Sequence, residues 1–255
     1  ELGFVGKKDP RNIKLSYTKR NILLNEMLTV CQNYIAREFV PILIARITCI
    51  LSEGDWQLQI NYDDPNIVEF EYPTSIEAKL DYIRPRVILE LGTHADPVPN
   101  ENYAITPFAA EHFPKLFTEP TCSIATVVAR RTFWEKATIL HAEYHRPKSK
   151  QIHLRYSRHY AYVAVMSLTR VVDDALADIE LLKSVTNHKD LFYHSAWAKY
   201  DQACPGSFHL MPRDERLPII GRDYREMSAM FFNEPPEFES ILKQLSDLEK
   251  RINST

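Results

Sequence analysis

Three basic residues surround the predicted beginning of one helix, in the stretch RTFWEKATILHAEYHRP at residues 131–147. Arg130 and Arg131 precede this helix, and Lys136 lies in its predicted first turn. Backbone amides at a helix N-terminus attract anions, and basic side chains add charge-assisted hydrogen bonds to phosphate. The spacing therefore indicates a phosphate-binding site, with a solvated basic surface as the alternative.

The other polar residues of this stretch have a structural explanation. Thr132 and Glu135 have the T-x-x-E spacing of a capping box, in which the two side chains satisfy backbone amides of the first turn. His141 and His145 share one helix face, but no glutamate directly follows the first histidine as it does in the HExxH zinc motif. We therefore predict a capped helix with structural histidines. Its predicted buried stripe contains Phe133, Ala137 and Leu140.

A second basic stretch, HLRYSRHY at residues 153–160, mixes Arg155, Arg158 and His159 with two tyrosines. Interleaved aromatic and basic side chains are typical of surfaces that bind RNA or a phosphate chain. The stretch suits the beginning of a helix equally well, with Ser157 as its N-cap. Both interpretations stay open on these residues alone.

Glu90 is a carboxylate in the otherwise apolar run RVILELG, residues 86–92. It is either a metal ligand, if other carboxylates face it, or a half-exposed strand position. In both cases Arg84 and Arg86 are its predicted partners.

The composition excludes several classes of protein. With 45% hydrophobic and 25% charged residues and a net charge of −3, any nucleic-acid binding would have to use a local basic patch. The longest apolar run, at 39–51, is interrupted by Arg46 and is too short to cross a bilayer, and the N-terminus has no signal-peptide pattern. The four cysteines are far apart, which favours reduced thiols in a cytoplasmic protein. The six glycines are not clustered as a P-loop or a GxGxxG turn requires.

The periodicity of apolar residues predicts an α+β fold, with strands before residue 130 and mainly helices after it. Predicted strands cover residues 56–62, 66–72, 86–92 and 123–129. The proline-rich region 93–122 is predicted to be loop. A helical hairpin is predicted at 18–52, with its two helices separated near Pro41. Predicted helices of the second half cover about 132–146, 157–173, 173–186, 188–200, 214–231 and 236–253.

Four segments of the chain carry a family resemblance. They are YIRPRVILELG (82–92), RTFWEKATILHAEYHRP (131–147), RYSRHY (155–160) and a C-terminal segment that begins PGSFHLMPRDERLPIIG (205–221). Together they resemble the AbiEii/AbiGii nucleotidyltransferase toxins of bacterial toxin–antitoxin and phage-defence (abortive infection) systems. The resemblance implies a polymerase-β-like core that uses Mg²⁺ held by carboxylates. Such a core transfers a nucleotide from an NTP to an acceptor, with RNA such as tRNA as the expected acceptor, and a cognate antitoxin is encoded nearby.

The resemblance also implies roles for particular residues and regions. Lys136 matches the family lysine that contacts the NTP phosphates, and it is a candidate catalytic residue together with Glu90, the candidate metal ligand. The candidate nucleotide-binding residues are Lys136, Arg130, Arg131, Arg158 and His159. The implied domains are a partial nucleotidyltransferase palm sheet at 1–129, with the helical hairpin at 18–52, and a helical C-terminal lobe at 130–255.

The chain departs from the family pattern at the metal-binding carboxylates. The family's glycine-serine and Asp-x-Asp motifs lie upstream of the segment that matches LGFVGKKDP, residues 2–10. Tyr162 stands where the family has an aspartate, and Arg130 stands where the family often has a glutamate. We therefore expect this stretch of chain not to catalyse by itself. The alternative function is that of a catalytically inactive relative that binds nucleotide, RNA or a protein partner.

Overall fold

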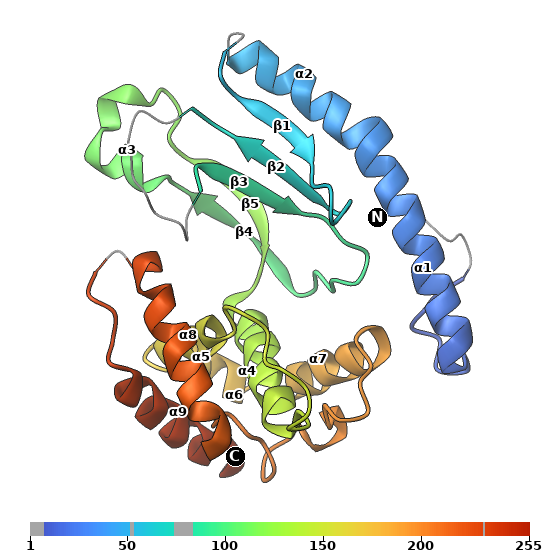
Figure 1. Cartoon of the computed structure of the whole chain (residues 1–255), viewed down its shortest axis with the longest axis vertical. Coiled ribbons are helices and arrows are strands. Elements are labelled where there is room, and N and C mark those ends of the chain that lie inside the picture. Colours follow the sequence, from blue (N-terminus) through green and yellow to red (C-terminus); the bar gives the residue numbers. More distant parts are fainter. Residues whose placement is uncertain (1–7, 52–53, 74–83, 232) are drawn as a thin grey trace. The chain divides into compact units, whose positions relative to one another are not determined.

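The computed structural model describes residues 8–51, 54–73, 84–231 and 233–255. The chain forms two compact units that divide between Ala95 and Asp96, and the short segment Ala229–Phe232 belongs to the first of them. Helices and two antiparallel sheets confirm the predicted α+β class (Figure 1). The predicted boundary between a palm domain at 1–129 and a helical lobe at 130–255 stays a prediction.

One long helical segment runs through the first half of the first unit. It consists of α1 (Tyr17–Tyr34), a π-helical turn (Ile35–Phe39) and α2 (Val40–Ile50). The residues at both junctions have right-handed helical backbone angles, so the predicted hairpin at 18–52 is wrong. Proline lacks an amide hydrogen, and its ring clashes with the carbonyl four residues before it. The wider π turn, closed by the bond from Val40 N–H to Ile35 O, directly precedes Pro41 and lets the helix continue.

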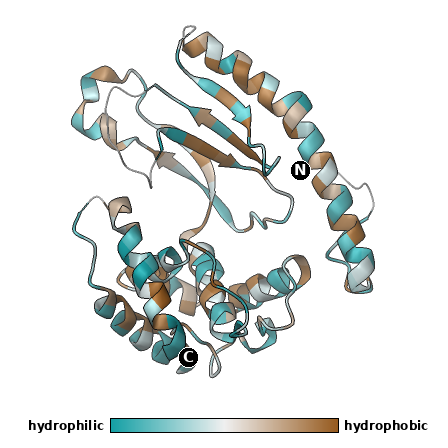
Figure 2. Cartoon of the chain, viewed as in Figure 1, coloured by the Kyte–Doolittle hydropathy of each residue, from teal (hydrophilic) through white to brown (hydrophobic). Residues whose placement is uncertain are grey.

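A three-stranded antiparallel sheet completes the first unit. Its strands are β1 (Gln57–Ile60), β2 (Ile67–Glu71) and β3 (Arg86–Glu90), in that spatial order. The three predicted strands are therefore confirmed. The core of this unit contains Cys31, Ile35 and Val40 of the long helix together with Val68 of β2. Figure 2 shows the apolar residues along β3, of which Leu89 packs against this core.

A two-stranded antiparallel sheet opens the second unit. It consists of β4 (Asn100–Ile105) and β5 (Cys122–Val127), with α3 (Phe108–His112) and a 3-10 turn (Pro114–Leu116) between the strands. The predicted strand at 123–129 corresponds to β5, whereas β4 lies in the region predicted to be loop. All six residues of β4 are exposed, so the strand forms by pairing with β5 and not by burying an alternating apolar face.

Helices make up the rest of the second unit. They are α4 (Ala129–His145), α5 (Ser157–Met166), α6 (Arg170–Leu176), α7 (Ile179–Phe192), α8 (Leu217–Glu226) and α9 (Phe238–Asn253). Helix α4 packs against α5, α6 and α7 (Figure 1). Its predicted buried stripe is confirmed, because Phe133, Ala137 and Leu140 have no exposed surface.

The helix predicted at 188–200 is wrong, since α7 already covers residue 188 and ends at Phe192. The side chain of Asp178 caps the beginning of α7 by accepting the Leu181 N–H at 3.1 Å. In the same way, the Thr169 hydroxyl accepts the Val171 N–H at the beginning of α6. These two caps begin α6 at Arg170 and α7 at Ile179, whereas the apolar periodicity predicts helices at 157–173 and 173–186.

Candidate functional site

Helix α4 begins three residues earlier than its sequence predicts. Its N-cap is Val128, which is buried and extended, and Val128 O accepts the N–H groups of Arg131 and Thr132. The predicted capping box of Thr132 and Glu135 is therefore wrong, since both residues lie inside the helix. Lys136 correspondingly lies in the third turn of α4 and not in the first, so amides at the helix N-terminus do not explain its position.

Arg131 lies in the interior and holds the beginning of α4 in place. Its side chain is 1% exposed, and its guanidinium lies 3.0 Å from both Asp96 Oδ2 and Glu135 Oε1. It also donates a hydrogen bond to Val98 O. Two carboxylates thus compensate this buried charge. Its neighbour Arg130 forms a looser ion pair, with Nε 3.8 Å from Asp178 Oδ2.

A second group of basic side chains lies between α4, α5 and α7. Lys136 is half-buried on α4, and its charge acts on both His159 of α5 and Lys189 of α7. The Lys189 ammonium donates a hydrogen bond of 2.6 Å to Glu135 O, the carbonyl directly before Lys136. Burial, followed by the charges of Lys136 and Arg131, lowers the pKa of Lys189 to about 7, against the effect of Glu135.

His159 is the most buried member of this group. It is 5% exposed, and its Nδ1 has no hydrogen-bond partner among the residues that the structure describes. Burial, followed by the charges of Lys136, Arg158 and Lys189, lowers its pKa to about 4. The imidazole is therefore neutral at neutral pH, in a place where several positive charges act together.

Lys189 was not among the residues that the sequence indicated. It follows Leu182 by seven residues and Val185 by four, and both of these are buried. The lysine therefore falls on the buried stripe of α7. A lysine on an otherwise apolar stripe is the signal that would have identified it, because lysine is mostly found on exposed helix faces.

The beginning of α5 differs from the prediction that Ser157 is its N-cap. This serine is the first residue of the helix, and its hydroxyl lies 3.8 Å from Met227 Sδ instead of capping the helix. The cap comes from Asp223 of α8, whose two carboxylate oxygens accept the N–H groups of Arg155 and Ser157 at 2.6 and 2.8 Å. Asp223 thus fixes the helix that carries His159.

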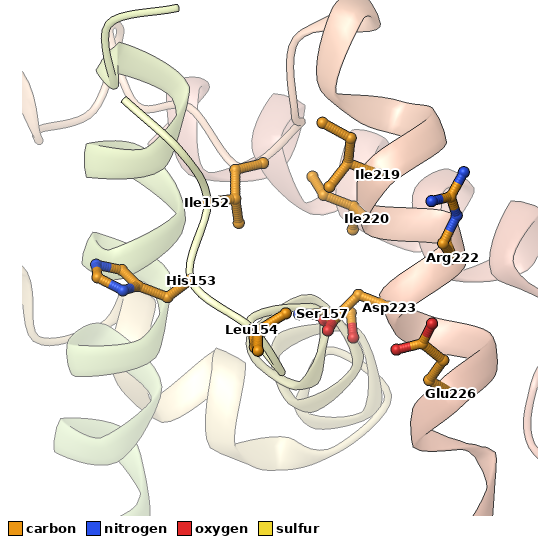
Figure 3. A pocket seen from close by; sticks show the side chains of 9 residues that line it. All are labelled: Ile152, His153, Leu154, Ser157, Ile219, Ile220, Arg222, Asp223 and Glu226. Atoms are coloured by element: carbon orange, nitrogen blue, oxygen red, sulfur yellow. Dashed lines mark hydrogen bonds between the residues drawn. The ribbon is translucent and has the colours of Figure 1, made fainter. Parts of the chain in front are cut away.

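A cavity of about 260 Å³ adjoins this cap (Figure 3). It lies between the segment before α5 and helix α8, and Figure 3 shows apolar side chains on both sides and the acidic Asp223 and Glu226 at one end. The apolar residues that line it are Ile152, Leu154, Ile219 and Ile220. Asp223 already accepts two backbone N–H groups, so its carboxylate serves to cap α5.

The two histidines of α4 do not form a metal site. His141 is fully buried, its Nε2 lies 3.0 Å from Lys199 O, and its Nδ1 accepts the His209 N–H at 3.2 Å. Both ring nitrogens are thus used by the backbone, which confirms His141 as a structural histidine. In the described parts of the chain, no three or more His, Cys, Asp or Glu residues gather in a group that could hold a metal ion.

Glu90 ends β3 in the first unit, where it is exposed and lies opposite Ile67. The predicted pairing of Arg86 with Glu90 is wrong, because Arg86 Nη1 lies 2.6 Å from Oε1 of the buried Glu69. Among the residues that the structure describes, Glu90 does not belong to a group of three or more His, Cys, Asp or Glu residues that could hold a metal ion, so Glu90 as a Mg²⁺ ligand stays a prediction.

The structure thus brings together only part of the predicted site. Lys136 and His159 belong to one group with the exposed Arg158 beside it, whereas Arg130 and Arg131 are paired with carboxylates. We define Lys136, His159 and Lys189 as the cationic cluster. What this arrangement can do chemically is attract and hold an anionic group between three helices.

Fold and site define an α+β protein whose helical unit carries a cationic cluster. The family model described as "Nucleotidyl transferase AbiEii toxin, Type IV TA system" matches residues 11–244. The chain therefore belongs to the AbiEii nucleotidyltransferase toxin family. No curated protein and no solved structure matches the chain significantly. None of the described helices is both long enough and apolar enough to span a membrane.

Proposed function

We propose that the protein transfers a nucleotide from an NTP to an RNA acceptor such as tRNA, in a bacterial toxin–antitoxin or phage-defence system in the cytoplasm. The observation that carries this proposal is the family match over residues 11–244, which includes the segment around Lys136. The type IV family implies a cognate antitoxin, and a nucleotidyltransferase would use an NTP.

In this proposal Lys136 binds the phosphates of the NTP. A lysine ammonium close to the triphosphate offsets the negative charge that develops as the phosphoryl group is transferred. The partly accessible position of Lys136 on α4 supports this role, because an ammonium must reach solvent to meet a diffusible ligand. Arg158 is exposed beside His159 and would add positive charge towards an RNA backbone.

Magnesium dependence is a further part of the proposal. When bound, Mg²⁺ would neutralise charge on the triphosphate, and Glu90 is its candidate ligand. Magnesium is usually held by one or two carboxylates together with the phosphates of the substrate, so Glu90 would share the ion with the triphosphate.

A catalytically inactive relative that binds nucleotide, RNA or a protein partner is the second candidate. Tyr162 favours it, since this residue occupies the position of the family aspartate and is 43% exposed on α5. A neutral phenol is a poor substitute for a carboxylate as a ligand of a hard cation.

The test measures transfer of labelled nucleotide to total bacterial RNA and, separately, NTP binding with and without Mg²⁺. If the first candidate is right, the protein labels RNA, and Lys136→Met lowers the rate by about a hundredfold. The control is Lys183→Met on the exposed face of α7, which should behave like wild type.

The two candidates give different results in this test. NTP binding that depends on Lys136 but not on Mg²⁺, without any transfer, would support the inactive relative. A folded protein that neither binds any NTP nor labels RNA would contradict both candidates.

A further inference from the structure

The cationic cluster contains a lysine that the proposed function has not yet used. Lys189 extends from the buried stripe of α7 to the carbonyl of Glu135, which it meets at 2.6 Å. Helix α4 packs on both α5 and α7, and the charges of Lys136 on α4 and Lys189 on α7 both act on His159 of α5. Burying an ammonium on an apolar stripe is costly, so a lysine at this position calls for a reason.

The acidic neighbour of Lys189 is already engaged. Glu135 is the carboxylate whose charge acts on Lys189, and its Oε1 lies 3.0 Å from Nε of the buried Arg131. The hydrogen bond of Lys189 goes to the backbone carbonyl of Glu135 and not to its carboxylate. A carbonyl is a weaker partner for an ammonium than a carboxylate, so this hydrogen bond compensates the positive charge of Lys189 only partly.

His159 provides the independent observation that a ligand belongs here. Its imidazole is 95% buried, and Nδ1 lacks a partner among the described residues although buried polar atoms are nearly always hydrogen-bonded. Positive charges from α4, α5 and α7 act on this ring. An anion with several acceptor oxygens would fit here, because it could accept a hydrogen bond from this nitrogen and pair with the positive charges that act on the ring.

We propose that Lys189 and His159, together with Lys136, form a phosphate-binding site between α4, α5 and α7, in which Lys189 is a binding residue for the polyphosphate of the nucleotide. The identity of the ligand rests on the proposed function, whereas the site itself rests on this geometry. A phosphate group would accept hydrogen bonds from the two ammonium groups and from Nδ1–H of His159.

Binding at this site is coupled to proton uptake. The pKa of Lys189 is lowered to about 7 and that of His159 to about 4, mainly because both groups are buried. The charged groups that face them are Arg131, Glu135 and Lys136 on α4 and Arg158 on α5. A bound anion favours the charged forms and raises both pKa values, so at pH 8 the complex takes up protons from the buffer.

The experiment titrates inorganic triphosphate into the full 255-residue chain by calorimetry at pH 8, in two buffers of different ionisation enthalpy. The variants are Lys189→Met, which keeps the length of the side chain without its charge, and Lys189→Arg, which keeps the charge. Lys183→Met is the matched control, because Lys183 lies on the same helix but pairs with Glu180 at the surface.

We expect triphosphate to bind wild type and Lys183→Met equally, with proton uptake. Lys189→Met should bind at least about tenfold more weakly and take up fewer protons, and Lys189→Arg should recover part of the affinity. Unchanged affinity in Lys189→Met, or a folded wild type that does not bind triphosphate, would overturn the inference. If Lys189→Met did not fold, Lys189→Gln would take its place, since unchanged triphosphate affinity in a folded Lys189→Gln equally contradicts the site.

The outcome also separates this inference from the proposed function. If Lys136→Met abolishes nucleotide transfer while Lys189→Met changes neither transfer nor triphosphate binding, the inference fails and the proposed function stands. If triphosphate binding depends on Lys189 but no nucleotide is transferred by wild type, the site stands and the proposed enzymatic function fails.

Discussion

Two basic side chains of the helical unit, the buried Arg131 and the half-buried Lys189, differ in how their charges are compensated. Arg131 lies between the carboxylates of Asp96 and Glu135, both at 3.0 Å. Lys189 donates to a backbone carbonyl and has the charge of Lys136 nearby. A buried cation matched by carboxylates holds the fold together, whereas one that is only partly matched is available to an anionic ligand.

The largest effect on stability is expected from replacing Arg131, the buried cation that is paired with two carboxylates. Arg131→Met leaves Asp96 and Glu135 without their partner and removes the donor to Val98 O. Since both carboxylates are partly exposed, water screens them, and we expect a loss of about 2–3 kcal/mol in the free energy of unfolding. Urea unfolding at pH 7 measures it. A loss below about 0.5 kcal/mol would show that pairing with carboxylates does not stabilise this contact between α4 and the segment before β4.

His141 extends the comparison to acidic pH, because it is a buried side chain whose two ring nitrogens both have backbone partners. Burial lowers the pKa of His141 to about 4 from its ordinary 6.5, which the carbonyl of Lys199 opposes and His145 and His209 reinforce. Between these two values the unfolded state binds more protons than the folded state, so stability falls as the pH is lowered from 6.5 to 4.

The variant His141→Gln should make this pH dependence shallower, because glutamine does not titrate. Unfolding measured at several pH values between 4 and 7 checks it, with the exposed His194 replaced by glutamine as the control. An identical slope in wild type and His141→Gln would contradict the assignment of this group as a buried neutral histidine.

Replacing Lys189, whose charge is only partly compensated, is expected to have a smaller effect on stability and of the opposite sign. Burial lowers the pKa of Lys189 to about 7, so the stability of wild type rises as the pH increases from 7 towards 10.5. Lys189→Met removes this dependence and the cost of burying the ammonium. At pH 7 we therefore expect the free energy of unfolding to rise by about 1 kcal/mol or less. A clear destabilisation instead would mean that Lys189 has the same structural role as Arg131.

The smallest effect belongs to a cation at the surface. Lys183 and Glu180 lie 2.6 Å apart on α7, but both side chains are mainly exposed. Lys183→Met should change the free energy of unfolding by no more than about 0.5 kcal/mol at any pH near neutrality. A larger change would weaken the comparison, because it would show that charge on α7 matters regardless of burial.

Lys189 and His159 show where prediction of the candidate site from the sequence succeeded and where it did not. The basic stretches around Lys136 and His159 are visible as residue types, and the structure places these two in one cluster. Lys189 follows Lys136 by 53 positions and joins the cluster only because α7 packs on α4. Arg131, by contrast, looks like Lys136 in the sequence and differs from it only through Asp96 and Glu135.

The sequence by itself determined the features that depend on near neighbours in the chain. Alternation gives β1 and β2 and an apolar run gives β3, helical spacing gives the buried stripe of α4, and the segment around Lys136 indicates the family. The tertiary structure decided how helices begin and which charges are compensated. Asp223, for example, caps α5 from 66 and 68 residues away. A local pattern does not contain such contacts, because they exist only after distant segments have packed together.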